Sequence, residues 1–430
     1  MVTILKRNER RLWLNYMFIA ICCPILADFF KGFGAPTFIL SIISFVDELF
    51  VISLLLVSLF IYRNIKIELF EIILFLFLLI GFISCINNSV PLYTSLLGAF
   101  NIVKAVFVYI CFKRLFFSFR DLIYFFKLIC FLFPLLFFSE IIEILVPNFR
   151  NLIGFTTAQP PVIRAGIKPI YGFFRPTQIT FIASTVFFIY TSYFSLKRHS
   201  VFYRYICVAM NIMTLKVKDN IAFIMSLIFS TKKRINNLYV GVAGALFVVL
   251  FYLYSILIPD HYNHYFESQD EYSNARVALV YTSAKILRDY FPFGVGFGRF
   301  ASSTTEHIKS PVYHQYGIDM VWGLDYDSNS NFVDDCFWPM IFGETGALGT
   351  LIYITLLYLC FSPYLTLYLK NTKNLKVAFV AQVFIFMLIS SLAKATLNGP
   401  PQSLLLWGGA GMFHYMAFEK EKLRKIIGKL

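Results

Sequence analysis

Long apolar stretches separated by short polar segments run through almost the whole chain. A membrane-spanning helix needs about 20 mostly apolar residues, and the apolar stretches either approach this length or form a pair of shorter ones. They cover residues 13–30, 36–61, 68–86, 93–112, 121–146, 177–196, 205–214, 219–231, 237–258, 339–369, 377–396 and 401–418. This pattern predicts an all-α, polytopic integral membrane protein with about twelve transmembrane helices.

The basic residues between these stretches predict the orientation of the chain. Lys and Arg accumulate in short cytoplasmic loops, and with twelve spans every basic cluster lies on the same side of the membrane. Both termini are then predicted to be cytoplasmic. The clusters are Lys6/Arg7/Arg10/Arg11, Arg63/Lys66, Lys113/Arg114/Arg120, Lys197/Arg198/Arg204, Lys232/Lys233/Arg234, Lys370/Lys373/Lys376 and Lys420/Lys422/Arg424/Lys425/Lys429.

Residues 205–231 decide whether the number of spans is even or odd. Polar residues interrupt this stretch at 214–219. If the stretch were one helix, the cluster at 232–234 would lie outside and the later topology would be inverted. A pair of short helices turning at 214–219 keeps all basic clusters inside, so we predict a hairpin.

The composition supports a membrane location and excludes several other classes of protein. Hydrophobic residues make up 58% of the 430 residues and charged residues only 14%, whereas soluble proteins average about 45–50% and about 25%. A soluble globular enzyme, a disordered chain and a secreted disulfide scaffold are therefore excluded. The eight Cys form no Cys-x-x-Cys pair, which argues against a zinc ribbon or a redox motif.

The predicted spans divide the chain into three regions. Residues 1–258 contain the first nine helices and a basic outer loop at 147–176. Residues 259–337 form a long outer loop, and residues 338–430 contain the last three helices and a basic cytoplasmic tail.

The loop 147–176 is unusual because it is rich in basic residues, although it is predicted to lie on the outer side of the membrane, where Lys and Arg are less common. It contains Arg150, Arg164, Lys168 and Arg175 and no acidic residue. Guanidinium groups match the geometry of phosphate, so one interpretation is an anionic ligand; the other is a solvated loop that touches anionic headgroups. Lys216 and Lys218, in the turn of the predicted hairpin, favour the first interpretation, because basic groups at membrane depth normally face a polar cavity.

A more specific set of motifs lies between residues 276 and 346. Arg276 is followed by Pro292-x-Gly294-x-Gly296-x-Gly298, and then by Asp334-Asp335, which precede Glu344-x-Gly346 at the start of a span. In this order, within a polytopic chain, the sequence from 205 to 346 resembles the O-antigen polymerase and O-antigen ligase superfamily (Wzy and WaaL).

The resemblance implies a GT-C-like fold and a metal-independent glycosyltransferase. Such an enzyme uses undecaprenyl-diphosphate-linked oligosaccharides as donor and acceptor at the periplasmic face of the bacterial inner membrane. It requires no cofactor, has the lipid bilayer, a flippase and a chain-length regulator as partners, and binds no nucleic acid. Arg276 matches the family's loop arginine, and Lys216 or Lys218 falls where many members carry a basic residue. Residues 172–176 loosely resemble the Gly-x-Phe-x-x-Pro entry to a span.

One departure favours the polymerase branch of this superfamily. The ligases place a His about nine residues before the Glu, and here Asp335 occupies that position. The leading hypothesis is therefore a polymerase that joins lipid-linked repeat units into a polysaccharide. The alternatives are a ligase that transfers finished glycan to lipid A-core or to a protein, and a transporter of lipid-linked oligosaccharide. Transport is disfavoured because no internal repeat of the kind found in transporters is visible.

The predicted site residues also have structural interpretations. Transfer from a lipid diphosphate needs cations for the leaving group and a base for the acceptor hydroxyl. Arg276, Lys216, Lys218, Arg164 and Arg175 could supply the cations, and Asp335 the base. Alternatively, Arg276 is an exposed salt-bridging residue and Asp335 caps the following helix.

Two further motifs in this region are interpreted without a bound cofactor. Gly294, Gly296 and Gly298 are interpreted as a tight turn, since glycine tolerates positive φ. Asp325-x-Asp327 resembles a metal motif but lacks the Gly and Glu of a calcium loop, so no metal is expected.

Overall fold

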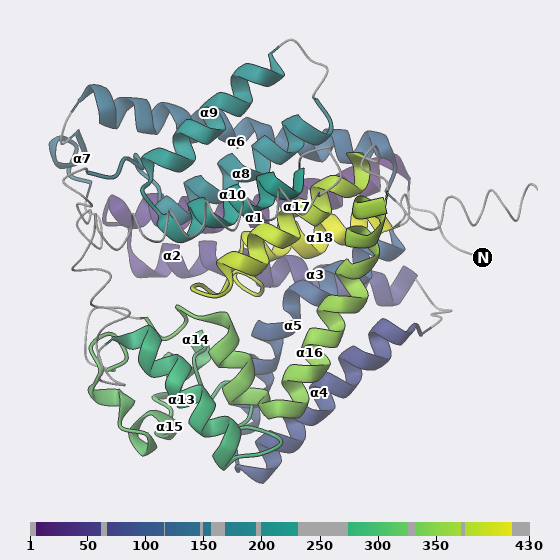
Figure 1. Cartoon of the computed structure of the whole chain (residues 1–430), viewed down its shortest axis with the longest axis vertical. Coiled ribbons are helices and arrows are strands. Elements are labelled where there is room, and N and C mark those ends of the chain that lie inside the picture. Colours follow the sequence, from purple (N-terminus) through teal and green to yellow (C-terminus); the bar gives the residue numbers. More distant parts are fainter. Residues whose placement is uncertain are drawn as a thin grey trace, which may run out of the picture.

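The chain folds into an assembly of helices (Figure 1). It is described by a computed structural model at residues 6–61, 67–115, 117–146, 149–155, 168–194, 199–230, 274–325, 332–370 and 375–414. Over these residues the structure contains helices and no strand. The helices are α1 (Arg7–Gly32), α2 (Thr37–Ser44), α3 (Val46–Ile61), α4 (Leu69–Asn87), α5 (Leu92–Arg114), α6 (Phe119–Leu145), α7 (Phe149–Leu152), α8 (Pro176–Ser192), α9 (Ser200–Met213), α10 (Val217–Ser230), α13 (Ala275–Asp289), α14 (Ser303–Ile308), α15 (Pro311–Gln315), the 3-10 helix η2 (Ile318–Met320), α16 (Phe337–Lys370), α17 (Leu375–Ser390) and α18 (Gln402–His414).

Helices occupy the predicted apolar stretches wherever the structure describes them. The predicted span 237–258 lies outside the described residues. Within the described ranges, six segments are long and apolar enough to cross a membrane: α1, Thr37–Leu59, α4, α5, α6 and Phe337–Tyr368. The apolar helix α9 and residues Val377–Ser390 of α17 are shorter. The confirmed part of the prediction is therefore an all-helical protein with several helices able to span a membrane.

The chain breaks between α9 and α10 at the position where the sequence predicts a turn. Leu215, between the two helices, has a φ of +49°. Along α9, Tyr203 stacks on Tyr190 near the end of α8, whereas Asn211 lies beside Ser184, closer to the start of α8. α9 therefore runs antiparallel to α8.

The next helix runs in the opposite direction. Thr180 Oγ1, in the first half of α8, donates a hydrogen bond of 3.2 Å to Asp219 at the start of α10. Four residues later, Phe223 packs against Phe187 in the second half of α8. α10 is therefore parallel to α8 and antiparallel to α9, which confirms the predicted hairpin.

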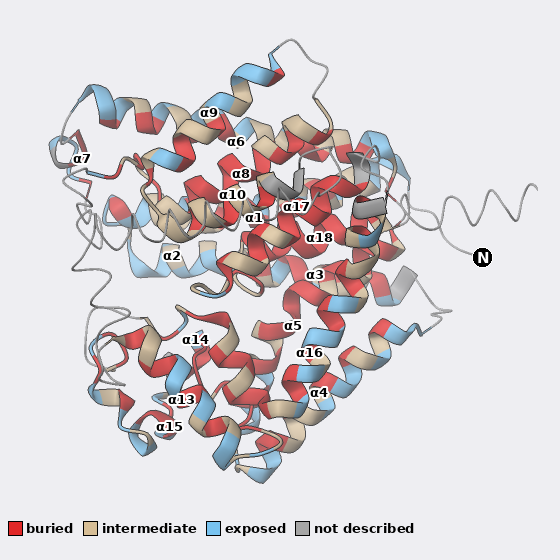
Figure 2. Cartoon of the chain, in the orientation of Figure 1, coloured by how far each residue is buried: buried red, intermediate tan, exposed pale blue. Residues whose placement is uncertain are grey.

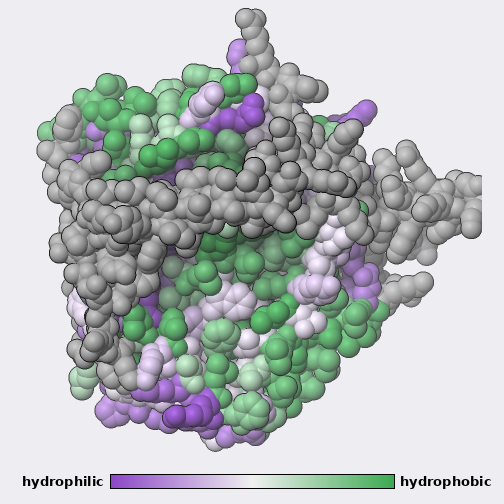
Figure 3. Space-filling model, in the orientation of Figure 1, coloured by the Kyte–Doolittle hydropathy of each residue, from purple (hydrophilic) through white to green (hydrophobic). Residues whose placement is uncertain are grey.

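The interior of the helical assembly is formed by α5, α8, α17 and α18, which are buried along most of their length (Figure 2). The outer surface also carries apolar side chains. Phe131 of α6 is 77% exposed, and Phe75 of α4 and Leu351 of α16 are exposed as well. In Figure 3 hydrophobic residues cover the surface over α4 and α16. Exposed apolar patches of this kind mark contacts with lipid or protein, and beside membrane-length helices they fit a lipid-facing surface.

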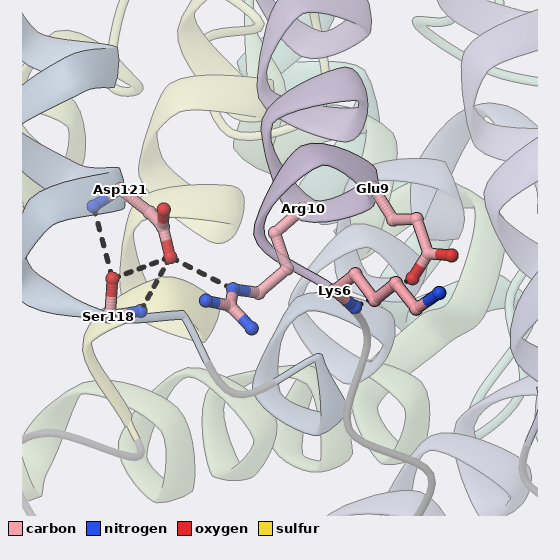
Figure 4. A network of polar contacts seen from close by, with 5 residues as sticks. All are labelled: Lys6, Glu9, Arg10, Ser118 and Asp121. Carbon is pink, nitrogen blue, oxygen red and sulfur yellow. Dashed lines mark hydrogen bonds and ion pairs between the residues drawn. The ribbon is translucent and has the colours of Figure 1, made fainter.

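Ion pairs join helix ends that carry the predicted cytoplasmic clusters. Arg10 Nε in α1 lies 2.9 Å from Asp121 Oδ2 in α6, and the Asp121 carboxylate also accepts hydrogen bonds from Ser118 (Figure 4). In the same view the backbone N–H of Lys6 donates to Glu9. Two similar pairs join the end of α5 to the start of α4: Lys113 with Glu68 and Arg114 with Glu71.

A buried ion pair fastens the middle of α5 to the first turn of α3. Lys104 Nζ lies 2.8 Å from Asp47 Oδ2 and 3.5 Å from Glu48 Oε1. Both Lys104 and Asp47 are buried. Removing one partner of such a pair costs about 3–5 kcal/mol, because a charge remains buried without compensation. The pair therefore fixes the packing of these two helices.

Candidate functional site

Arg276 and Asp335, which the sequence analysis assigned to separate roles, form one ion pair. Asn274 caps α13 by accepting a hydrogen bond from the backbone N–H of Val277 at 3.1 Å, which places Arg276 in the first helical turn. Its Nε and Nη2 donate to Asp335 Oδ2 at 3.0 and 2.6 Å. The two side chains are 31% and 26% exposed, so the pair is accessible from outside the protein.

The partners of Asp335 decide between the two interpretations of this residue. Its Oδ2 accepts hydrogen bonds from Arg276, and no backbone N–H at the start of α16 donates to its carboxylate within the described part of the chain. Asp335 is therefore not a cap of α16. Among the described residues, Oδ1 has no hydrogen-bond donor, so one oxygen of the carboxylate remains available to a ligand.

The contact with Asp335 agrees with the alternative interpretation of Arg276 as an exposed salt-bridging residue. Nearly a third of its side chain is exposed, which fits that alternative and also leaves the guanidinium accessible to a ligand. The neighbouring Cys336 is buried, and burial raises the pKa of its thiol to about 11. Cys336 is therefore protonated at neutral pH, and a thiolate nucleophile is absent from this position.

Lys218 extends the pair into a cationic cluster. Its Nζ donates a hydrogen bond to the backbone carbonyl of Ala393, in the segment that joins α17 to α18. Its charge interacts with those of Arg276, Asp335 and Lys216. The start of α10 thus places Lys218 close enough to interact with the pair formed by α13 and the residues before α16, and Lys216 lies next to Lys218 in the preceding turn.

Arg175 lies in a second group of charges at the start of α8. Its Nη2 is 2.6 Å from Asp28 Oδ1 near the end of α1, and Gln178 Nε2 donates to Asp28 Oδ2, also at 2.6 Å. Lys394, in the segment between α17 and α18, donates to Thr177 Oγ1 at 3.1 Å. The charge of Lys394 interacts with those of Arg175 and Asp28.

Asp219 links the two groups. It is 4% exposed and accepts hydrogen bonds from Thr180 Oγ1 at 3.2 Å and from Ser390 Oγ at 3.4 Å. Its carboxylate interacts electrostatically with both Lys218 and Lys394. The two groups of charges are therefore neighbours around one buried carboxylate, although six separate segments of the chain contribute to them.

The structure thus brings together most of the residues that the sequence predicted as a site. These are Arg276, Asp335, Lys216, Lys218 and Arg175, whereas Arg164 lies outside the described residues. Sequence reasoning missed Lys394, Asp28 and Asp219. Each of these is a charged residue at the end of an apolar stretch. Such a residue usually faces the protein interior or a polar cavity. Their position in the sequence is therefore the signal that could have identified them.

The glycine motif forms a tight turn against a break in α16. Gly294, Gly296 and Gly298 have φ values of +78°, +94° and +78°. A Cβ added to Gly294 would lie 2.4 Å from the carbonyl oxygen of Gly343. Gly346 is itself non-helical, with a φ of +63°. The two glycine motifs of the sequence therefore pack directly on each other and have a structural role.

Glu344 holds this turn in place. The backbone N–H groups of Val295 and Gly296 donate to the carbonyl oxygens of Gly343 and Glu344, each at 2.9 Å. The Glu344 side chain is fully buried, and its Oε1 accepts hydrogen bonds from the backbone N–H of Phe300 and from Ser302 Oγ at 3.2 and 2.9 Å. This carboxylate organises the region around α13 and does not reach the charge cluster.

The metal motif of the sequence is only partly described. Asp325 is within the described residues, and Asp327 lies outside them. Among the described residues, no group of three or more His, Cys, Asp or Glu side chains is arranged to hold a metal ion.

No protein-family model matches this chain, and no curated protein matches it.

Proposed function

We propose that the protein is a polysaccharide repeat-unit polymerase that works at the periplasmic face of the bacterial inner membrane. It transfers a growing glycan from undecaprenyl diphosphate to a new lipid-linked repeat unit. The observation that supports this proposal is the pair of cations, Arg276 and Lys218, at an accessible carboxylate, Asp335. Lys216 lies next to Lys218, and Arg175 belongs to the neighbouring group of charges. Such a cluster suits a reaction that releases a lipid diphosphate.

In the proposed reaction, the acceptor hydroxyl oxygen attacks the anomeric carbon of the donor glycan. The bond between that carbon and the diphosphate oxygen breaks, and undecaprenyl diphosphate leaves with the electron pair. Asp335 takes the hydroxyl proton, for which its Oδ1 is available because Arg276 binds only Oδ2. A positioned base of this kind contributes about 10²–10⁴-fold to the rate.

The cations stabilise the charge that develops on the leaving diphosphate. Preorganised charges of this type act more strongly in a site from which water is excluded. Arg276 contacts the proposed base directly, and the charge of Lys218 interacts with both, so these two cations are the first contacts of the donor diphosphate. In this role they require no metal ion, in agreement with the resemblance to a metal-independent glycosyltransferase.

The proposed function requires twelve crossings, with both termini in the cytoplasm and the charge cluster outside. Reporter fusions at residues 90, 160 and 310 should then report a periplasmic location, and fusions at 117 and 372 a cytoplasmic one. The reason is that all basic clusters lie on one side only with this topology. A cytoplasmic signal at 310 would contradict the topology and put the site in the wrong compartment.

A deletion strain tests the proposed function against its closest alternative. Loss of a polymerase should leave glycans of a single repeat unit in the lipopolysaccharide or capsule ladder, since the flippase still delivers repeat units and the chain-length regulator has nothing to act on. Loss of an O-antigen ligase would instead leave full-length polymer on undecaprenyl diphosphate. That second result would overturn the proposal in favour of the ligase.

A further inference from the structure

Trp322 is an exposed aromatic residue in a well-packed turn of the outer loop. Its side chain is 66% exposed, whereas Val321 and Leu324 on either side of it are buried. The backbone N–H of Leu324 donates to the carbonyl oxygen of Val321 at 2.9 Å and closes the turn. Burial of so large an apolar ring would be favourable. The turn instead holds the ring in solvent at a fixed place, as a ligand-binding residue requires.

Phe332 connects this turn to the proposed base, Asp335. The ring centroids of Trp322 and Phe332 are 5.2 Å apart, and the backbone N–H of Phe332 donates to the carbonyl oxygen of Gly323 at 2.8 Å. The carbonyl oxygen of Phe332 in turn accepts a hydrogen bond of 3.1 Å from the backbone N–H of Asp335. In a four-residue turn of this kind the first and last Cα atoms lie within about 7 Å of each other. Trp322 is therefore fixed close to Asp335 through a single intervening residue.

Gly323 is required for this arrangement. Its φ is +84°, and a Cβ at this position would lie 2.1 Å from Cδ2 of Phe332. Glycine therefore allows the Phe332 ring to lie directly against the turn. The contact with Phe332 orients the Trp322 ring and still leaves most of its side chain open to a ligand.

The segment that carries Trp322 is acidic, which indicates what kind of ligand it suits. Between residues 310 and 335 the chain contains no Lys or Arg but five Asp, namely Asp319, Asp325, Asp327, Asp334 and Asp335. Anionic lipid headgroups attract basic residues and not acidic ones, so a contact with the membrane surface is disfavoured. Carboxylates accept hydrogen bonds from hydroxyl groups. The C–H groups of a sugar ring can pack on the negative face of an aromatic ring. An uncharged sugar matches both features.

We propose that Trp322 is the stacking platform for the acceptor sugar, the ring that carries the attacking hydroxyl. This inference rests on the proposed function and extends it to a residue that recognises the glycan and not the diphosphate. The apolar face of the sugar lies on the Trp322 ring, and one of its hydroxyl groups points to Asp335. An acidic sugar would be repelled by the Asp residues of the segment, so the sugar at this position is uncharged.

The test compares two ligands that differ only in the glycan. One is the undecaprenyl-diphosphate-linked repeat unit isolated from the deletion strain, and the other is undecaprenyl diphosphate without sugar. The Kd of each for the purified full-length chain is measured by calorimetry, and the wild-type chain should prefer the sugar-bearing ligand. Trp322→Ala should raise the Kd for that ligand about tenfold and leave the Kd for undecaprenyl diphosphate unchanged. The unchanged value also shows that the variant is folded. Trp322→Tyr should keep most of the preference, because an aromatic face remains.

Phe291 provides the matched control. It is an aromatic residue of the same outer loop with 72% of its side chain exposed. It follows the end of α13, whose 15 residues extend over about 20 Å, whereas Arg276 lies at the start of that helix. Phe291→Ala should therefore keep the preference of the wild-type chain. The inference would be overturned if Trp322→Ala kept the preference, or if it weakened the binding of both ligands equally.

The same measurements separate the platform from the proposed function. A preference that depends on Trp322, in a wild-type chain that makes no polymer, would support the platform and refute the polymerase. Polymer formed by Trp322→Ala with an unchanged KM for the repeat unit would refute the platform alone. A wild-type chain that binds both ligands equally would also overturn the platform.

Discussion

Replacing Asp335 with Asn should stop chain extension while the protein still folds and binds lipid-linked donor. Asn keeps the size of the side chain and an oxygen that can accept a hydrogen bond from Arg276, but it cannot take the proton of the acceptor hydroxyl. The expected loss in the rate of transfer is about a hundredfold or more. It would be measured as polymer formed per unit of membrane-inserted protein.

Asp334 provides the control for this variant, because it is adjacent in sequence and equally acidic. Asp334→Asn should keep the polymer ladder. If Asp335→Asn also kept an unchanged ladder, Asp335 would not be the base, and its contribution would be limited to the ion pair with Arg276.

The second large effect is expected when Arg276 is replaced with Ala. The variant loses one cation from the diphosphate and also removes the group that orients Asp335. Loss of one contact that strengthens in the transition state costs about 3 kcal/mol, on the order of a hundredfold in rate. Arg276→Lys should recover part of the activity, since the charge remains while the two-pronged contact is lost. Chain length at equal protein level is the measurement.

A double-mutant cycle separates the two contributions of Arg276. If the arginine acts partly through Asp335, the effects of Arg276→Ala and Asp335→Asn on the rate should be less than additive, as expected for residues in direct contact. Normal chain lengths in Arg276→Ala would show that this residue has no part in the reaction.

Much of the fold could be predicted from the sequence because lipid imposes a simple rule on the chain. Backbone polar groups must be satisfied within the span, so an apolar stretch of sufficient length becomes a helix. The hairpin, predicted at 214–219, followed from the expectation that the basic cluster at 232–234 lies inside, which requires an even number of spans. The break of α16 at Gly346 was not foreseen, because it depends on the glycine turn that packs against it.

The candidate site could be predicted only in part. The sequence singled out Arg276 and Asp335 one at a time, but their ion pair joins residues 59 positions apart and depends on how α13 meets the start of α16. Asp219 and Lys394 lie at the ends of apolar stretches, where a charged residue is also expected simply because the span ends there. Their proximity to each other arises from the packing of α10 against α17, which no local pattern encodes.

Incubating the purified protein with one synthetic undecaprenyl-diphosphate-linked repeat unit and no other enzyme tests the central claim most directly. We predict a ladder of glycans that remain lipid-linked, with one undecaprenyl diphosphate released for each repeat unit added, and no ladder from Asp335→Asn. Recovery of the repeat unit unchanged, from wild-type protein that binds it, would contradict the account.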